Sequence, residues 1–140
     1  MTEKYPLPLP DLVETIAGIE SLPERLKNCH DDSYDVPTAE TLGAATRFVA
    51  ALYTALHDSK KDWICPHVAA DASGEVILEW WVGIKKITIY VTATGAIEYV
   101  FSWGSDMNTE MEADTMTGIE EGVRLWSRLV SPTPETIRMR

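Results

Sequence analysis

The chain has 140 residues, 45% of them hydrophobic, and its 22 acidic and 12 basic side chains give a formal net charge of −10. A chain of this length is typical of one domain and can bury a hydrophobic core without a metal ion or a disulfide. The negative charge argues against direct nucleic-acid binding, which depends on Lys and Arg neutralising phosphates, and it suits either solubility or a basic partner.

The start of the chain carries no targeting pattern. Residues 1–6 lack a basic start followed by an apolar run, so we predict no signal peptide. No apolar stretch reaches the roughly 18 residues that a membrane-spanning helix needs, so we expect no membrane partner. We therefore predict a cytoplasmic protein in which Cys29 and Cys65 are reduced thiols, with a disulfide between them as the disfavoured alternative.

Residues 1–10 alternate proline with bulky side chains, which predicts an extended arm that packs on the body or, alternatively, serves as a polyproline ligand. A helix is predicted from Asp11 to Leu22, because Leu12, Ile16 and Ile19 share one stripe. Pro23 either interrupts this helix or begins a second short one capped by Ser21.

Residues 28–37 are polar and predict a surface loop. Thr38 is a suitable N-cap for a helix that runs to about His57. The apolar face of this helix has amphipathic spacing and consists of Leu42, Ala45, Val49, Leu52, Tyr53 and Leu56.

From Trp63 onward the apolar spacing changes to every second residue, which indicates β-strands. Residues 64–70 form a candidate edge strand that Pro66 breaks near its start. Turns at 71–74, at Gly83 and at 93–96 separate three further runs at 76–82, 86–92 and 97–103. One face of the predicted antiparallel meander is apolar and the other is mixed, as in a sheet covered on one side.

Residues 104–116 contain four acidic side chains and no basic one. Thr117 and Glu120 then have the spacing of a capping box and predict a final helix. Its expected apolar stripe consists of Ile119, Val123, Trp126 and Val130. Prolines end this helix, and residues 131–140 are predicted to form a loose tail. The predicted fold class is α+β, with N-terminal helices, a meander of three to four strands and a C-terminal helix packed on the sheet, in one domain over 1–140.

Several segments between Leu22 and Val100 resemble a group of small uncharacterised bacterial α+β proteins. The matching segments are Leu22-Pro23, 37–52, Pro66-His67-Val68, 74–80 and 87–89. They correspond to a Leu-Pro turn, an Ala-rich helix, a Pro-led strand, and a Gly turn with a strand that ends in Glu-Trp. Where that group has Trp in a Gly-rich loop, this chain has Ser33-Tyr34-Asp35. The resemblance implies the fold and no activity.

Cys29, His30, Cys65 and His67 supply four donors of the kinds that bind zinc. Dedicated sites normally show spaced pairs, whereas these pairs are adjacent or separated by Pro66. We therefore predict free thiols, no metal and no other cofactor. A Cys-His nucleophile pair is the alternative, but no orienting motif or oxyanion turn follows either cysteine.

Glu79 and Glu98 are predicted to project from the polar face of the sheet, where two facing carboxylates could perform acid–base chemistry. An open meander face is not a cleft, however, and the chain has no Gly-rich phosphate loop. We predict no catalytic residue, and an enzyme is the less favoured class.

Aromatic residues carry the most specific expectation. Trp80, Trp103 and Trp126 are predicted to lie in the core, whereas Trp81 falls on the opposite sheet face near Tyr90. This pair either packs under another element or forms an exposed anchor, since Trp and Tyr are enriched at interface hot spots. The predicted binding residues are Trp81, Tyr90, Glu79, Glu98, Asp106, Glu110, Glu112 and Asp114.

The leading functional hypothesis is a non-enzymatic, acidic protein-binding module. One version is an inhibitor or antitoxin-like protein that masks a basic, nucleic-acid-facing surface. Two alternatives remain open: a small enzyme or metal- or ligand-binding domain, and a homodimer that associates through the open sheet face or an edge strand.

Overall fold

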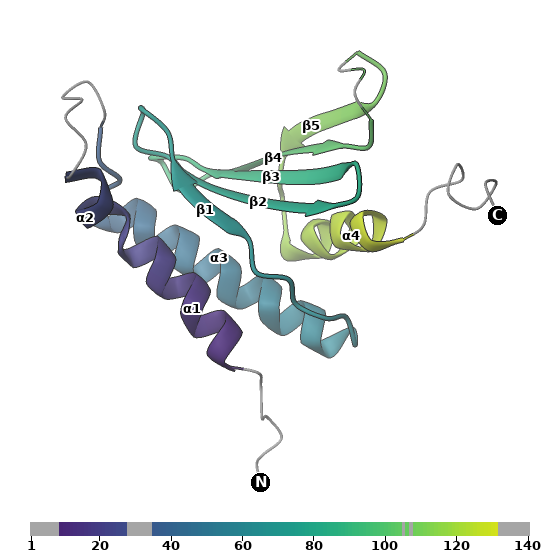
Figure 1. Ribbon diagram of the computed structural model, residues 1–140, viewed down its shortest axis with the longest axis horizontal. Helices are drawn as coiled ribbons and strands as arrows, with labels where there is room; N and C mark the ends of the chain where they lie inside the picture. The colour runs from purple at the N-terminus through teal and green to yellow at the C-terminus, as the bar shows by residue number, and fades with distance from the viewer. Residues whose placement is uncertain (1–8, 28–34, 105, 107, 132–140) are drawn as a thin grey trace, which may run out of the picture.

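The computed structural model describes residues 9–27, 35–104, 106 and 108–131 (Figure 1). Three predicted segments lie largely outside the described residues. Their parts that are not described are residues 1–8 of the predicted arm, 28–34 of the predicted loop and 132–140 of the predicted tail. The elements in chain order are α1 (Leu9–Glu20), α2 (Leu22–Lys27), α3 (Ala39–Asp58), β1 (His67–Ala70), β2 (Val76–Val82), β3 (Lys85–Val91), β4 (Ile97–Ser102), β5 (Met111–Thr115) and α4 (Ile119–Val130).

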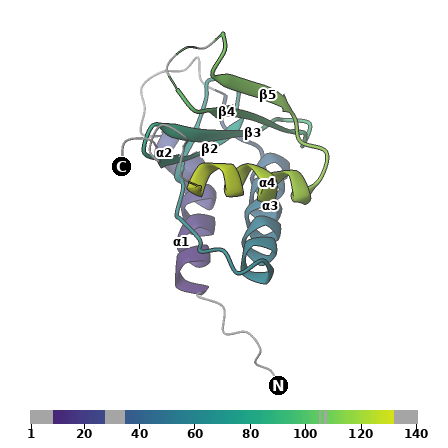
Figure 2. The same ribbon diagram turned by 90° about the vertical axis from the view of Figure 1, so that its right-hand side faces the viewer.

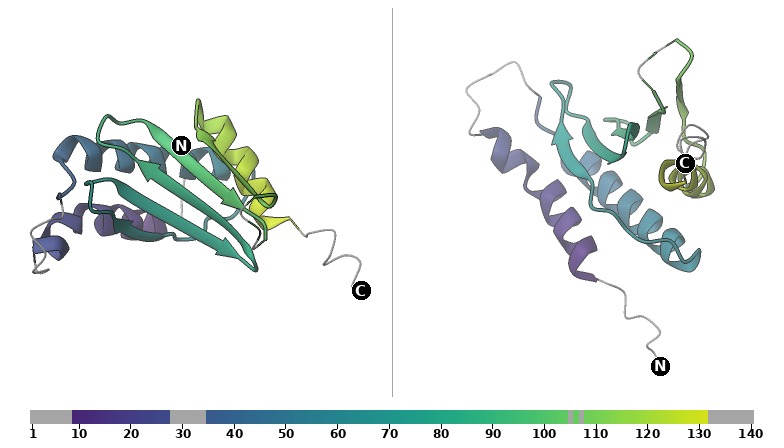
Figure 3. Two further views of the ribbon diagram at one scale, coloured as in Figure 1. Left: turned by 90° about the horizontal axis from the view of Figure 1, so that it is seen from above. Right: turned by 45° about the vertical axis from the view of Figure 1, so that its right-hand side comes forward.

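The strands form one antiparallel sheet in the order β1-β2-β3-β4-β5, with α1, α3 and α4 on one side of it. Figure 2 shows α4 crossing beneath the strands, with α1 and α3 further from the sheet's β5 edge. Seen from above, the strands lie over α1 and α3 (Figure 3, left). The α+β prediction is therefore confirmed, including a sheet covered by helices on one side.

The helix α3 begins and packs as its sequence indicates. The Thr38 hydroxyl oxygen accepts a hydrogen bond from the Thr41 backbone N–H at 3.1 Å, which satisfies one of the free donors of the first turn. The predicted apolar face is buried except for Leu42, which is half-buried, and Phe48 joins it. The second short helix at Leu22 is also confirmed, and Leu22 is buried in the core.

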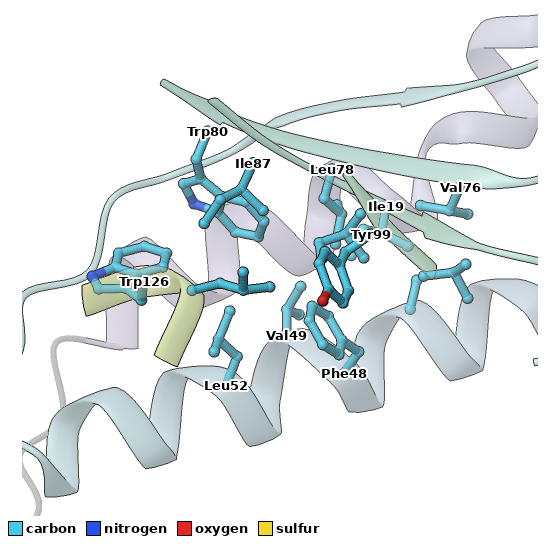
Figure 4. Packing of buried hydrophobic residues seen from close by; sticks show 14 of the residues in the cluster. Ile19, Phe48, Val49, Leu52, Val76, Leu78, Trp80, Ile87, Tyr99 and Trp126 are labelled. Carbon is cyan, nitrogen blue, oxygen red and sulfur yellow. The ribbon is translucent and has the colours of Figure 1, made fainter. Parts of the chain in front are cut away.

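Alternate residues of β2, β3 and β4 point toward the helices and form the core. In Figure 4, Val76, Leu78 and Trp80 descend from the sheet toward Phe48, Val49 and Leu52 of α3. Full burial of one such large apolar side chain stabilises the fold by about 1.5–3 kcal/mol. The residues between them must point the other way, because successive side chains in a strand alternate between faces.

An aromatic cluster closes one end of this core. Trp63 stacks on Trp126 with ring centroids 5.8 Å apart and meets Trp80 edge to face at 6.0 Å and Tyr53 at 5.3 Å. The indole N–H of Trp80 donates a hydrogen bond to the Ile64 carbonyl oxygen at 2.6 Å. These contacts hold the segment between α3 and β1 against α4. Trp80 and Trp126 are core residues as predicted, whereas Trp103 is only half-buried.

A buried lysine connects the start of β3 to the end of α4. The Lys85 side chain is 6% exposed, and its ammonium group donates to the carbonyl oxygens of Arg128, at 2.6 Å, and of Ser131. Carbonyls in the last turn of a helix lack helical partners, and a cation there also interacts favourably with the helix dipole. Burial, followed by the charge of Arg128, lowers the pKa of Lys85. Lys85 therefore serves as a cap for α4 supplied by another element.

Several boundaries and the number of strands differ from the sequence predictions. Helix α1 begins at Leu9, so the end of the predicted arm is helical, and the edge strand β1 begins at His67 rather than at residue 64. The acidic segment 104–116 contains a fifth strand, β5, which pairs with β4. Its alternation is hard to detect because the helix-side positions hold the carboxylates Glu112 and Asp114 instead of apolar side chains.

The final helix also starts differently. Gly118 is its N-cap, without a side-chain bond, and it is the carboxylate of Glu121, not of Glu120, that accepts from the Thr117 backbone N–H at 3.2 Å. The predicted capping box is therefore wrong by one position. Val130 of the predicted stripe is exposed, and the buried face of α4 consists of Gly122, Leu125, Trp126 and Leu129. Among the described residues, no helix combines the length and the apolar character needed to cross a bilayer.

Replacing the buried lysine tests its role in holding α4. Lys85→Met retains the buried stem but removes the donor to the helix carbonyls, so we expect a loss of about 1–2 kcal/mol in the free energy of unfolding. Lys27→Met, at an exposed helical position, is the matched control and should change stability by less than about 0.5 kcal/mol. Urea denaturation measures both, and equal stabilities for the two variants would contradict the capping role.

Candidate functional site

The sheet face that carries no described helix is called the open face here. Strand register places its side chains in three rows across the sheet. The first row is Ala69, Ile77, Tyr90, Glu98 and Thr115; the second is His67, Glu79, Thr88, Val100 and Ala113; the third is Trp81, Lys86, Ser102 and Met111. The face is thus mixed: apolar side chains alternate with carboxylates and hydroxyls, and Thr88 at its centre is only 5% exposed.

Trp81 lies on the open face and is 49% exposed, so no described element covers it. Its cross-strand partner is Lys86, and the Lys86 ammonium lies 5.3 Å from the Trp81 ring centroid. The His67 ring, on β1, lies 6.4 Å from the Trp81 ring between centroids. The predicted proximity to Tyr90 is wrong, because Tyr90 pairs with Ile77, four residues further along the hairpin and about 14 Å away.

Ile84 is a second exposed apolar residue of the β2–β3 hairpin. Val82 pairs with Lys85, so the loop consists of Gly83 and Ile84 alone. Gly83 has a φ of +64°, a conformation that glycine adopts without strain and that places it first in a II′-type hairpin turn. Ile84 occupies the second position and is 72% exposed. Two large apolar side chains, Trp81 and Ile84, are therefore presented by one tight hairpin.

The two carboxylates predicted on this face are there, but they do not face each other. Glu79 pairs with Thr88, and Glu98 pairs with Tyr90, so they lie two strands and two residues apart, about 12 Å between Cα atoms. Glu79 forms an ion pair with Lys86 at 3.2 Å and lies 3.7 Å from Nδ1 of His67, whereas Glu98 is exposed. This separation does not suit acid–base chemistry on one substrate atom.

The end of the open face opposite Trp81 is negatively charged. Glu75 precedes β2 there, close to Asp71 and Glu98. Burial first, and then the neighbouring carboxyls of Asp71 and Glu98, raise the pKa of Glu75. None of these three carboxylates forms an ion pair with a basic residue in the described part of the chain. A positively charged group from outside would be attracted to this end.

The acidic segment before α4 divides into exposed and internally used carboxylates. Asp106 and Asp114 are exposed, and Asp106 accepts from the Asn108 backbone N–H at 2.9 Å, which lowers its pKa. Glu110 is half-buried and accepts from the Asp106 backbone N–H at 3.0 Å. These bonds shape the β4–β5 connection.

Glu112, one of the predicted binding residues, is engaged within the chain. It points toward α4 and accepts hydrogen bonds from Arg128 at 2.8 Å, Tyr99 at 2.8 Å and Arg124 at 3.4 Å. The bonds to Arg128 and then Tyr99 lower the pKa of Glu112. Burial and the same hydrogen bond raise the pKa of Tyr99 to about 12. Arg128 also lies over the Phe101 ring, at 4.4 Å, so this network attaches β5 to α4.

The predicted cysteine and histidine set is only partly described. Cys29 and His30 lie outside the described residues, and Cys65 and His67 are both exposed. Cys65 instead lies beside Asp11 and Glu14, and one potential ligand atom from each of these exposed residues falls within 4.8 Å of the others. Exposed acidic groups commonly gather without a metal, so this arrangement adds no support for a metal centre.

Sequence reasoning missed two residues of the open-face end, Lys86 and Ile84. A signal for both was present: a two-residue loop begun by Gly83 fixes the hairpin register and so pairs Trp81 with Lys86. The β1–β2 register then places His67 beside Glu79, two residues from Trp81 along β2. The chain matches no family, curated protein or solved structure with which it was compared.

The carboxylate that joins β5 to α4 should make stability depend on pH. Because the folded-state pKa of Glu112 is lowered, its contribution is present above the unfolded value of about 4.3 and is lost as pH falls through the folded value. Relative to Glu112→Gln, the wild type should be more stable at neutral pH by about 1 kcal/mol, a modest figure because a third of the side chain is exposed.

Urea denaturation at a series of pH values measures this difference, which should shrink as the pH falls below about 4. Asp114→Asn, on the same strand but outside the ion pairs, is the matched control for loss of one negative charge. A difference between wild type and Glu112→Gln that stays constant over the whole pH range would contradict the assignment.

Proposed function

We propose that this chain is a non-enzymatic protein-binding module that presents the open face to a protein with a basic surface. The observation that carries the proposal is Trp81, a tryptophan 49% exposed on a sheet face that no described helix covers. An inhibitor that masks a basic surface is the version of this function that the charge favours.

Trp81 and Ile84 have the properties of an interface anchor. Tryptophan is among the residues most enriched at hot spots, where a few side chains carry most of the binding energy. Exposed large apolar side chains are common singly, whereas this one hairpin carries two of them within four residues. The hairpin itself is fixed, because Lys85 bonds it to the end of α4. Contacts made by Trp81 and Ile84 would therefore require little reorganisation of the backbone.

Charge selects the kind of partner. Three basic side chains pair with carboxylates within the chain: Lys86 with Glu79, and Arg124 and Arg128 with Glu112. The carboxylates of Asp71, Glu75 and Glu98 lack such partners among the described residues. With a net charge of −10 the chain attracts basic surfaces and accelerates encounter with them. A second copy would instead oppose these carboxylates with like charges.

Alanine substitution in the hairpin tests the anchor. In affinity capture from cells that express the protein, Trp81→Ala and Ile84→Ala should weaken retention of the partner at least about tenfold. Val13→Ala is the matched control, since Val13 is 59% exposed on α1, away from the open face. Equal retention by wild type and Trp81→Ala would contradict the proposal.

Two further measurements identify the partner's chemistry. Retention of a basic partner should fall as salt is raised, because salt screens attraction between exposed charges. Sedimentation at increasing protein concentration should show a monomer. A dimer that Trp81→Ala dissociates would replace the basic partner with a second copy of the chain.

A further inference from the structure

Trp81 is flanked by Lys86 and His67, which come from the two neighbouring strands. Lys86, on β3, places its ammonium 5.3 Å from the Trp81 ring centroid, and His67, on β1, places its ring 6.4 Å from it. A cation over an indole face is attracted by the ring's negative charge distribution. The pose of the exposed tryptophan therefore depends on where these two side chains lie.

Glu79 connects both of them. It stands two residues before Trp81 on β2 and therefore on the same face. Its two carboxylate oxygens are each used: one lies 3.7 Å from Nδ1 of His67 and the other 3.2 Å from Nζ of Lys86. The Glu79 side chain is only 22% exposed, and its cross-strand neighbour Thr88 is buried, so it has little freedom to move away.

We propose that Glu79 is a positioning residue that fixes the pose of Trp81 through Lys86 and His67. This inference rests on the proposed function and deepens it, because it identifies what prepares the anchor for its basic partner. Without the carboxylate, Lys86 has no anionic partner among the described residues, and the indole gains access to other rotamers. A tryptophan that must be ordered during association binds less tightly than one already held in place.

Nuclear magnetic resonance of the free protein tests the inference without a partner. In Glu79→Gln, the indole N–H resonance of Trp81, assigned with Trp81→Phe, should shift, and its cross-relaxation contacts with Lys86 and His67 side-chain protons should weaken or vanish. Lys86→Met, which leaves Glu79 intact, should reproduce the loss of order at Trp81. Unchanged Trp81 signals in Glu79→Gln would overturn the positioning role.

Glu98→Gln is the matched control, because it removes the same charge from the same face at a position away from Trp81. It should leave the Trp81 signals unchanged; an equal shift in this variant would also overturn the proposal by showing a general charge effect. In partner capture, Glu79→Gln should weaken binding by about two- to tenfold, less than Trp81→Ala. Failure of the proposed function appears separately, as retention of the partner by Trp81→Ala.

Discussion

The fold and the candidate site both depend on the pleat of strand β2. Trp80 and Trp81 are consecutive, so they must point to opposite faces of the sheet. Trp80 is fully buried among aromatic rings, and its indole N–H is bonded to the Ile64 carbonyl oxygen. A shift of the strand register by one residue would expose Trp80 and leave a cavity at its place in the core. The burial of one tryptophan therefore fixes the exposure of the next.

Several basic side chains bind carbonyl oxygens or carboxylates within the molecule. Lys85 bonds the carbonyls of α4, Lys86 pairs with Glu79, and Arg124 and Arg128 hold Glu112. Lys85 joins β3 to α4, Arg124 and Arg128 join α4 to β5, and Lys86 joins the two strands of one hairpin. Each ion pair cancels one positive and one negative charge, so the net charge of −10 still acts outward.

Much of the fold could be predicted because its signals are local. Thr38, the spacing of apolar residues in α3 and the alternation in β2 to β4 each depend on a few neighbouring residues. Strand β5 could not be predicted this way, since Glu112 occupies a helix-side position and becomes acceptable there only beside Arg128 from another element. The group of side chains around Trp81 likewise depends on the register between β1, β2 and β3. The alternation of side chains along β2 predicts that Trp81 and Glu79 share a face. Their contacts with Lys86 and His67 follow only from the pairing of β2 with β3 and β1.

The two edges of the sheet have a consequence for assembly. Edge strands expose unpaired backbone groups and can recruit further strands. Strand β1 has only four residues and follows Pro66, which has no N–H to donate, and β5 carries Glu112 and Asp114. Short length, proline and carboxylates are the means by which natural sheets block addition of strands from other molecules. Both margins of the sheet therefore carry features that oppose strand addition, so association through the open face and association through the edges are separate questions of chemistry.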